Sequence, residues 1–147
     1  MDSKKTVLVS GGAGYIGTHT TVALIEAGYD VVVIDNFSNS EASALDGVEK
    51  IVGRKVVFGE IDTCDIKALR GVFERHAFDT VIHFAAYKAV GESMDEPLKY
   101  YQNNLVSYMN VLEMMKEFKR PNVLFSSSAT VYGNAEELPV TEESPRQ

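Results

Sequence analysis

Hydrophobic positions along this chain alternate between short continuous runs and stripes with helical spacing. The short runs predict strands over 7–10, 30–35, 55–61, 79–86 and 122–126. The stripes lie between them and predict helices over 15–27, 43–52, 66–73 and 97–118. Strands and helices thus alternate, and the run 31–34 suits a strand buried on both faces. The pattern therefore predicts an α/β fold with a doubly wound parallel sheet.

The first predicted strand runs directly into a glycine-rich turn. Its glycines fit Gly-x-Gly-x-x-Gly from Gly12, or Gly-x-x-Gly-x-x-Gly from Gly11, and both spacings include Gly14 and Gly17. With either spacing, the glycines can adopt positive φ. Because they lack a Cβ, phosphate oxygens can reach the first N–H groups of a helix, and that helix can pack closely on the strand. The turn therefore predicts a dinucleotide site in a Rossmann-like sheet. A plain glycine turn is the alternative; a triphosphate loop would need a lysine where Thr18 stands.

Two of the predicted strands end in an acidic residue. Asp35 closes the second strand, where a carboxylate accepts a hydrogen bond from the ribose 2′-OH and repels a 2′-phosphate. This favours NAD over NADP as the cofactor. Asp35 could instead begin the turn 35–40, a common role of aspartate. Asp62 ends the third strand, where contact with the adenine edge and a turn or capping role are both open.

Three other features invite an interpretation. Hydroxyl side chains follow the fifth predicted strand, and ligands of parallel sheets bind beyond such carboxyl ends, so these hydroxyls are candidates for chemistry. His83 lies within an apolar strand, which favours a packed, hydrogen-bonded core histidine over an acid–base group. The stripe of the last helix is assigned to core packing; its members are Leu98, Tyr101, Leu105, Tyr108, Val111, Leu112 and Met115.

The composition narrows the class of protein. With 147 residues, 45% of them hydrophobic, the chain has the size of one globular domain. Its formal net charge is -7 and its 14 Lys and Arg residues are scattered, so no basic stripe is available for nucleic acid or membrane. Cys64 is the single cysteine, which points to a reducing compartment, the cytoplasm. The three histidines lack ligand spacing, so no metal is expected, and the run 7–9 is too short for a signal peptide or a membrane span.

Longer stretches carry a resemblance to a known family. The glycine turn and the segments 35–36, 83–93, 100–104 and 125–133 together resemble the UDP-glucose 4-epimerases, which are extended short-chain dehydrogenase/reductases. The resemblance covers essentially the whole chain. It implies a tightly held NAD that takes a hydride from C4 of a UDP-sugar, leaves a 4-keto intermediate, and returns the hydride to the opposite face. UDP-galactose and UDP-glucose would be interconverted without net oxidation.

The resemblance also assigns site residues by position. Ser128 matches the catalytic serine, which hydrogen-bonds the 4-oxygen of the sugar and so also binds the substrate. The implied cofactor contacts follow successive strands and are Gly11, Gly14, Tyr15, Ile16, Gly17, Asp35, Asn36, Phe37, Ser38, Asn39, Ser40, Asp62, Thr63, Phe84, Ala85, Ala86, Tyr87, Lys88, Asn103 and Ser126. Ala86 and Tyr87 stand where the family more often has Gly-Leu, a departure expected to change NAD affinity.

The family's catalytic base is a tyrosine in a Tyr-x-x-x-Lys pair, and none of the seven tyrosines has a lysine four residues later. We therefore expect this chain alone to lack useful epimerase turnover. It resembles an N-terminal fragment, with an incomplete NAD-binding domain over 1–134 and a loop over 135–147 that leads toward a missing C-terminal part. A homodimer is expected for the full-length protein.

Two alternatives stay open. A nucleotide-sugar dehydratase or decarboxylase is the nearest one, but sugar 4,6-dehydratases place an Asp-Glu pair where Ala129 and Thr130 stand here. The other is a stand-alone NAD-binding module without turnover of its own.

Overall fold

The computed structural model describes residues 4–135 and 137–146. Strands and helices alternate along this part of the chain. In order they are β1 (Thr6–Ser10), α1 (Tyr15–Glu26), β2 (Asp30–Asp35), α2 (Ser43–Val52), β3 (Val57–Glu60), α3 (Ile66–Arg75), β4 (Thr80–His83), α4 (Val90–Asp95), α5 (Pro97–Glu117), β5 (Asn122–Phe125) and the 3₁₀ helix η1 (Ala129–Tyr132).

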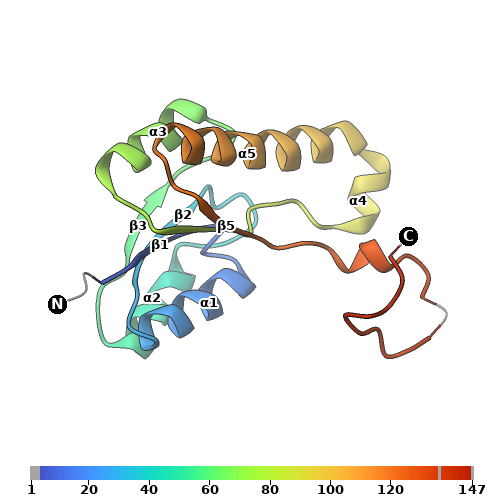
Figure 1. Ribbon diagram of the computed structural model, residues 1–147, viewed down its shortest axis with the longest axis horizontal. Helices are drawn as coiled ribbons and strands as arrows, with labels where there is room; N and C mark the ends of the chain where they lie inside the picture. Colours follow the sequence, from blue (N-terminus) through green and yellow to red (C-terminus); the bar gives the residue numbers. More distant parts are fainter. Residues whose placement is uncertain (1–3, 136, 147) are drawn as a thin grey trace.

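The five strands form one parallel sheet in the order β3-β2-β1-β4-β5. Helices α1 and α2 cover one face, and α3 and α5 cover the other (Figure 1). This confirms the predicted doubly wound α/β fold. The direction of winding reverses between β1 and β4, and ligands of such sheets bind in the crevice beyond the carboxyl ends at that reversal.

The central strands are buried on both faces because helices pack on each side. On β1, Leu8 belongs to a cluster with α3 and α5, whereas Val7 and Val9 belong to a cluster with α1 and α2. On β2, Val32 and Val33 divide in the same way. The continuous apolar runs that predicted these strands follow from this double burial.

Three strands are shorter than predicted. β4 ends at His83 rather than Ala86, because β1 leaves the sheet at Gly11 and the last paired residues are Ser10 and His83. β3 covers Val57–Glu60 instead of 55–61, and β5 ends one residue early. Both lie at an edge of the sheet and have only one neighbouring strand.

Two short helices were not predicted, namely α4 and η1. Helix α4 has six residues and η1 has four, so neither is long enough to show the repeating apolar stripe from which a helix is predicted, and neither contains a buried residue. Beyond η1, the described residues of the predicted loop, which are 135 and 137–146, form turns and bends. Residues 1–3, 136 and 147 of the predicted domain and loop lie outside the described part.

The predicted core stripe of α5 is only half correct. Val111 and Met115 are buried in the cluster with α3, and Tyr108 contacts the ring of His83. In contrast, the side chains of Leu98 and Leu105 are 80% and 55% exposed, and Tyr101 and Leu112 are exposed as well. The amino-terminal half of α5 extends past the sheet toward α4, which leaves this part of the stripe without a partner (Figure 1).

Candidate functional site

The glycine turn between β1 and α1 is packed so tightly that no side chain fits at Gly11 or Gly17. Gly11 has a φ of +72°, and a Cβ there would lie 2.6 Å from the backbone nitrogen of Ala85. A Cβ on Gly17 would lie 2.6 Å from the Cα of Gly12. Glycine at position 11 therefore allows the loop after β4 to approach the turn, and glycine at position 17 allows α1 to lie against it.

The backbone N–H groups in the first turn of helix α1 have no side-chain cap. Gly14 is the N-cap residue and provides no side-chain cap, and the first turn holds no acidic residue. The N–H groups of Tyr15, Ile16 and Gly17 therefore have no acceptor within the helix, and the helix dipole adds partial positive charge at this end. The side chains of Tyr15 and Ile16 are exposed. This arrangement fits a pyrophosphate group.

The carboxylate of Asp35 lies beside this turn. Its Oδ2 accepts a hydrogen bond from the backbone N–H of Ala13 at 3.0 Å. Its Oδ1 accepts from Ser40 Oγ at 2.8 Å and from the N–H of Phe37 at 3.0 Å. The turn role of Asp35 is thus present in the structure. Each carboxylate oxygen has two acceptor sites, so Oδ2 retains one for a ribose hydroxyl.

The loop after β3 lies next to the loop that follows Asp35. Asn36 Nδ2 donates to Asp62 Oδ2 at 3.3 Å, and the N–H of Cys64 donates to Asp62 Oδ1 at 2.8 Å. Asp62 therefore makes a turn, whereas Asp65 is the residue that caps α3. Thr63 is buried. The predicted contacts of the adenosine half, 35–40 and 62–63, thus lie on adjoining loops.

The loop after β4 contains the predicted contacts Phe84 to Lys88 and is fixed to α5. The side-chain amide of Asn104 bonds both the N–H and the C=O of Tyr87, at 2.8 and 2.9 Å. Asn103 Nδ2 donates to Asn104 Oδ1 at 3.0 Å. Asn104 was missed as a site residue; it lies within a segment that carries the resemblance, but its sequence position does not reveal its partner.

The aromatic ring of Tyr87 is also held from the helix side. The Lys99 ammonium lies 5.0 Å from the ring centroid, and the ring of Tyr100 lies 5.6 Å away. Glu92 on α4 accepts hydrogen bonds from Lys99 Nζ and the Tyr100 hydroxyl, each at 2.6 Å. The hydrogen bond from Lys99, followed by that from Tyr100, lowers the pKa of the Glu92 carboxyl. The predicted cofactor loop therefore contacts α5, and Glu92 joins the same part of α5 to α4.

His83 lies at the end of β4, directly before this loop. It is 2% exposed and its ring packs 5.3 Å from that of Tyr108 and 6.3 Å from that of Phe125. Burial lowers its pKa from 6.5 to about 4. His83 is packed in the core as predicted, whereas the predicted hydrogen bonding is not found at Nδ1, which has no partner among the described residues.

Ser126 and Ser128 follow β5 at the same edge of the sheet. The N–H of Ser126 donates to His83 O at 3.2 Å. Ser128 is exposed; its Oγ accepts from the N–H of Thr130 at 3.3 Å and lies 2.8 Å from Thr130 Oγ1. No histidine, lysine or tyrosine side chain of the described residues hydrogen-bonds the Ser128 hydroxyl.

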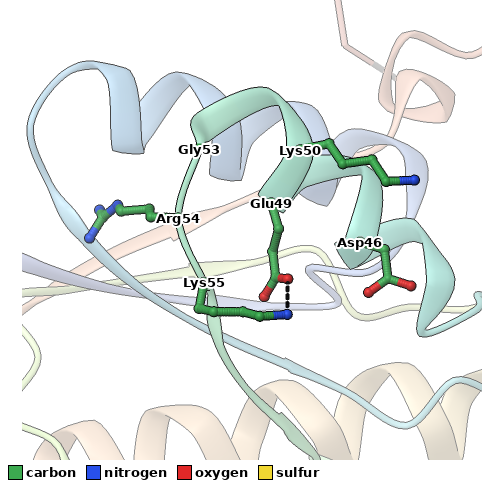
Figure 2. A pocket seen from close by; sticks show the side chains of 6 residues that line it. All are labelled: Asp46, Glu49, Lys50, Gly53, Arg54 and Lys55. Atoms are coloured by element: carbon green, nitrogen blue, oxygen red, sulfur yellow. Dashed lines mark hydrogen bonds and ion pairs between the residues drawn. The ribbon is translucent and has the colours of Figure 1, made fainter.

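A surface hollow at the opposite edge of the sheet is separate from this site (Figure 2). It is lined by Asp46, Glu49, Lys50, Gly53, Arg54 and Lys55. Helix α2 runs against the strand direction, so its last turn lies near the amino ends, where Arg54 contacts Asp30 at the start of β2. Glu49 and Lys55 pair at 2.6 Å. The hollow is therefore distant from the glycine turn.

Two kinds of feature do not occur in the described ranges 4–135 and 137–146. No group of three or more His, Cys, Asp or Glu side chains there is placed to bind a metal ion. No helix in the same ranges is both long enough and apolar enough to cross a membrane.

The strand order, the glycine turn at its reversal and the acid at the end of the adjoining strand define a Rossmann-like domain of the dinucleotide-binding type. Residues 8–147 match the family described as GDP-mannose 4,6 dehydratase, and the chain belongs to this family.

Individual proteins with similar sequences carry a more specific name than the family does. UDP-glucose 4-epimerase 2 of Arabidopsis thaliana is 51% identical over 144 residues, which are 96% of this chain and 41% of that protein. The mouse UDP-glucose 4-epimerase is 51% identical over 145 residues, which are 95% of this chain and 42% of that protein. The chain thus spans about two fifths of the length of these relatives.

A solved structure shows the same fold. The UDP-glucose 4-epimerase of Bifidobacterium longum, in complex with NAD+ and UDP, has a TM-score of 0.93 and 49% identity. The match covers 97% of this chain and 43% of that one.

Proposed function

We propose that this chain is the NAD-binding part of a UDP-glucose 4-epimerase that interconverts UDP-galactose and UDP-glucose. The observation that carries the proposal is the hydrogen bond from Ala13 N–H to Asp35 Oδ2, which joins the glycine turn at the strand reversal to the acid at the end of the adjoining strand β2. Relatives of about 50% identity bear the epimerase name, and the Bifidobacterium structure contains NAD+ and UDP.

In this proposal, residues 1–134 form the domain and 135–147 lead toward further sequence. The open N–H groups at the start of α1 bind the pyrophosphate, and Asp35 accepts from the adenosine ribose. Bound NAD supplies a reversible hydride acceptor for C4 of the sugar. Ser128 donates a hydrogen bond to the sugar 4-oxygen, for which its exposed hydroxyl at the carboxyl edge is suitably placed.

An epimerase is favoured over a dehydratase by the residues after Ser128. Elimination of water across C5 and C6 needs groups that move protons, and the alanine methyl at position 129 cannot do so. Epimerisation needs a phenol base whose pKa a nearby lysine lowers, and no Tyr-x-x-x-Lys pair occurs in this chain. We therefore propose that the 147 residues bind NAD but do not turn over UDP-sugars by themselves. The alternative, a stand-alone NAD-binding module, shares that binding.

Cofactor binding is tested by calorimetry and thermal unfolding with NAD. NAD at 100 times its dissociation constant should stabilise the folded chain by about 2.7 kcal/mol. Asp35→Ala should weaken this binding, whereas Asp30→Ala, at the other end of the same strand, should leave it unchanged. A folded chain whose melting temperature does not change with NAD would overturn the proposal.

Turnover is tested by joining this chain to the remaining sequence of a relative that contains a Tyr-x-x-x-Lys pair. The fusion should interconvert UDP-galactose and UDP-glucose, and Ser128→Ala should reduce kcat while the control Ser43→Ala should not. Turnover that is insensitive to Ser128→Ala would remove the catalytic role proposed for this serine. Equal turnover by the fusion and by the isolated chain would show that the pair is not needed.

We also propose that the full-length protein is a homodimer formed through the exposed apolar face of α4 and α5. Its exposed members are Val90, Met94, Leu98, Tyr101, Leu105 and Met109. Unpartnered apolar surface of this kind favours association. Leu105→Lys should shift the sedimentation of a dimer to that of a monomer, whereas Ile51→Lys on α2 should not. The cytoplasm is our proposed compartment, supported by the single cysteine.

A further inference from the structure

Helix α5 carries two asparagines whose side chains bond the backbone of two different loops. Asn104 Oδ1 accepts from Tyr87 N–H at 2.8 Å, and its Nδ2 donates to Tyr87 C=O at 2.9 Å. One side chain thus satisfies both polar backbone groups of a residue that belongs to no strand. Without this amide, both groups would need water.

Asn110 makes a second contact of this kind farther along the helix. Its Nδ2 donates to the carbonyl oxygens of Thr63 and Cys64, at 2.9 and 3.0 Å. These two residues follow β3. Asn104 and Asn110 together therefore fix the loops after β4 and after β3 to one rigid helix.

The two loops lie on opposite sides of the reversal in the sheet. The loop after β3 belongs to the half formed by β1, β2 and β3, where Asp35 lies. The loop after β4 belongs to the other half. A dinucleotide spans the reversal, so each loop serves one of its two mononucleotide halves.

We propose that Asn104 and Asn110 are positioning residues for the cofactor, each holding the loop of one half of NAD. This proposal rests on the NAD binding proposed above. Both loops are held in one conformation before the ligand arrives, so their ordering entropy is not lost on binding. Substituting one asparagine should therefore weaken only the half of the ligand that its loop contacts.

The test uses calorimetry with NAD and AMP as separate probes, because AMP occupies only the adenosine half. Asn110→Leu should weaken NAD and AMP alike, each by about tenfold. Asn104→Leu should weaken NAD by about tenfold and leave AMP within about twofold. Asn122→Leu is the matched control, because Asn122 Nδ2 donates to Asp79 C=O at the amino edge of the sheet. It should change neither affinity.

Two further measurements separate positioning from general stability. Asn104→Asp keeps the acceptor for Tyr87 N–H but sets a carboxylate oxygen against the Tyr87 carbonyl oxygen, so it should weaken NAD at least as much as Asn104→Leu does. It also serves if the leucine variant does not fold. Hydrogen exchange at the Tyr87 amide should be faster in Asn104→Leu and unchanged in Asn122→Leu.

The outcomes distinguish this inference from the proposed function. If the folded wild-type chain binds no NAD, the proposed function fails and this inference fails with it. If the wild type binds NAD and both leucine variants bind it equally well, only this inference fails. Equal loss of AMP and NAD affinity in Asn104→Leu would also overturn it, because the effect would then not be confined to one half.

Discussion

Acid should destabilise this domain through His83, because the folded state holds that side chain neutral. Burial lowers its pKa from 6.5 to about 4, and no partner of Nδ1 among the described residues offsets the lost hydration. Below about pH 6.5 the unfolded chain binds a proton that the folded chain does not. The stabilising contribution is therefore present above that pH and is lost as pH falls toward 4.

The size of the effect follows from the two pKa values. Each pH unit between 6.5 and about 4 removes about 1.4 kcal/mol from the free energy of unfolding, so the total is on the order of 3 kcal/mol. About 2 kcal/mol of it should be lost by about pH 5. This is a large share of the stability of an ordinary small domain, which is about 5–15 kcal/mol.

Urea unfolding followed by circular dichroism, at several pH values from about 7 to 5, measures this loss. His83→Phe keeps an aromatic ring packed against Tyr108 and Phe125, and it removes the titrating group. Its unfolding free energy should fall less with acid than that of the wild type, by about 2 kcal/mol over this range. Carboxylates that titrate in both proteins cancel in the difference.

His19→Gln is the matched control, since His19 is exposed on α1. It should show the acid dependence of the wild type. The reasoning would be refuted if His83→Phe and the wild type lost stability in parallel. In that case the folded state would accept the proton on His83 as readily as the unfolded chain does.

Three other predictions follow from single contacts. Gly11→Ala places a Cβ 2.6 Å from Ala85 N at a residue with positive φ, so it should lower the urea midpoint. The decrease should be larger than that caused by Gly53→Ala, because Gly53 also has positive φ but its Cβ would meet open space. Equal midpoints of the two variants would contradict this. Asp35→Ala should reduce the preference for NAD over NADP in competitive binding, and an unchanged preference would remove the ribose role. Asp65→Ala removes the cap of α3 and should cost about 0.5–2 kcal/mol in urea unfolding, with no change in NAD affinity.

Among the strands, those with helices packed on both faces are the easiest to place from the sequence. Runs such as 31–34 are apolar throughout because helices cover both faces of β2, and the run alone is enough to place the strand. The end of β4 could not be predicted, because it depends on where β1 leaves the sheet rather than on the residues 84–86. Apolar character continues there, but the neighbouring strand does not.

Helix α5 shows a second limit of pattern analysis. Its stripe has uniform helical spacing from Leu98 to Met115, but only the part that lies over the sheet is buried. Spacing shows which face of a helix is apolar and does not show what covers that face. The predicted helix was therefore correct, while the predicted core was half correct.

The candidate site divides in the same way, into local and distant contacts. The glycine turn and the N-terminus of α1 lie within a few residues of each other, so their geometry follows from the motif itself. The asparagine contacts join α5 to Tyr87, 17 residues away, and to Thr63, 47 residues away. No spacing rule connects such positions, because their distance in space depends on the completed fold. A motif can thus indicate which cofactor half meets which strand, whereas the residues that fix the loops become visible only when α5 is packed on the sheet.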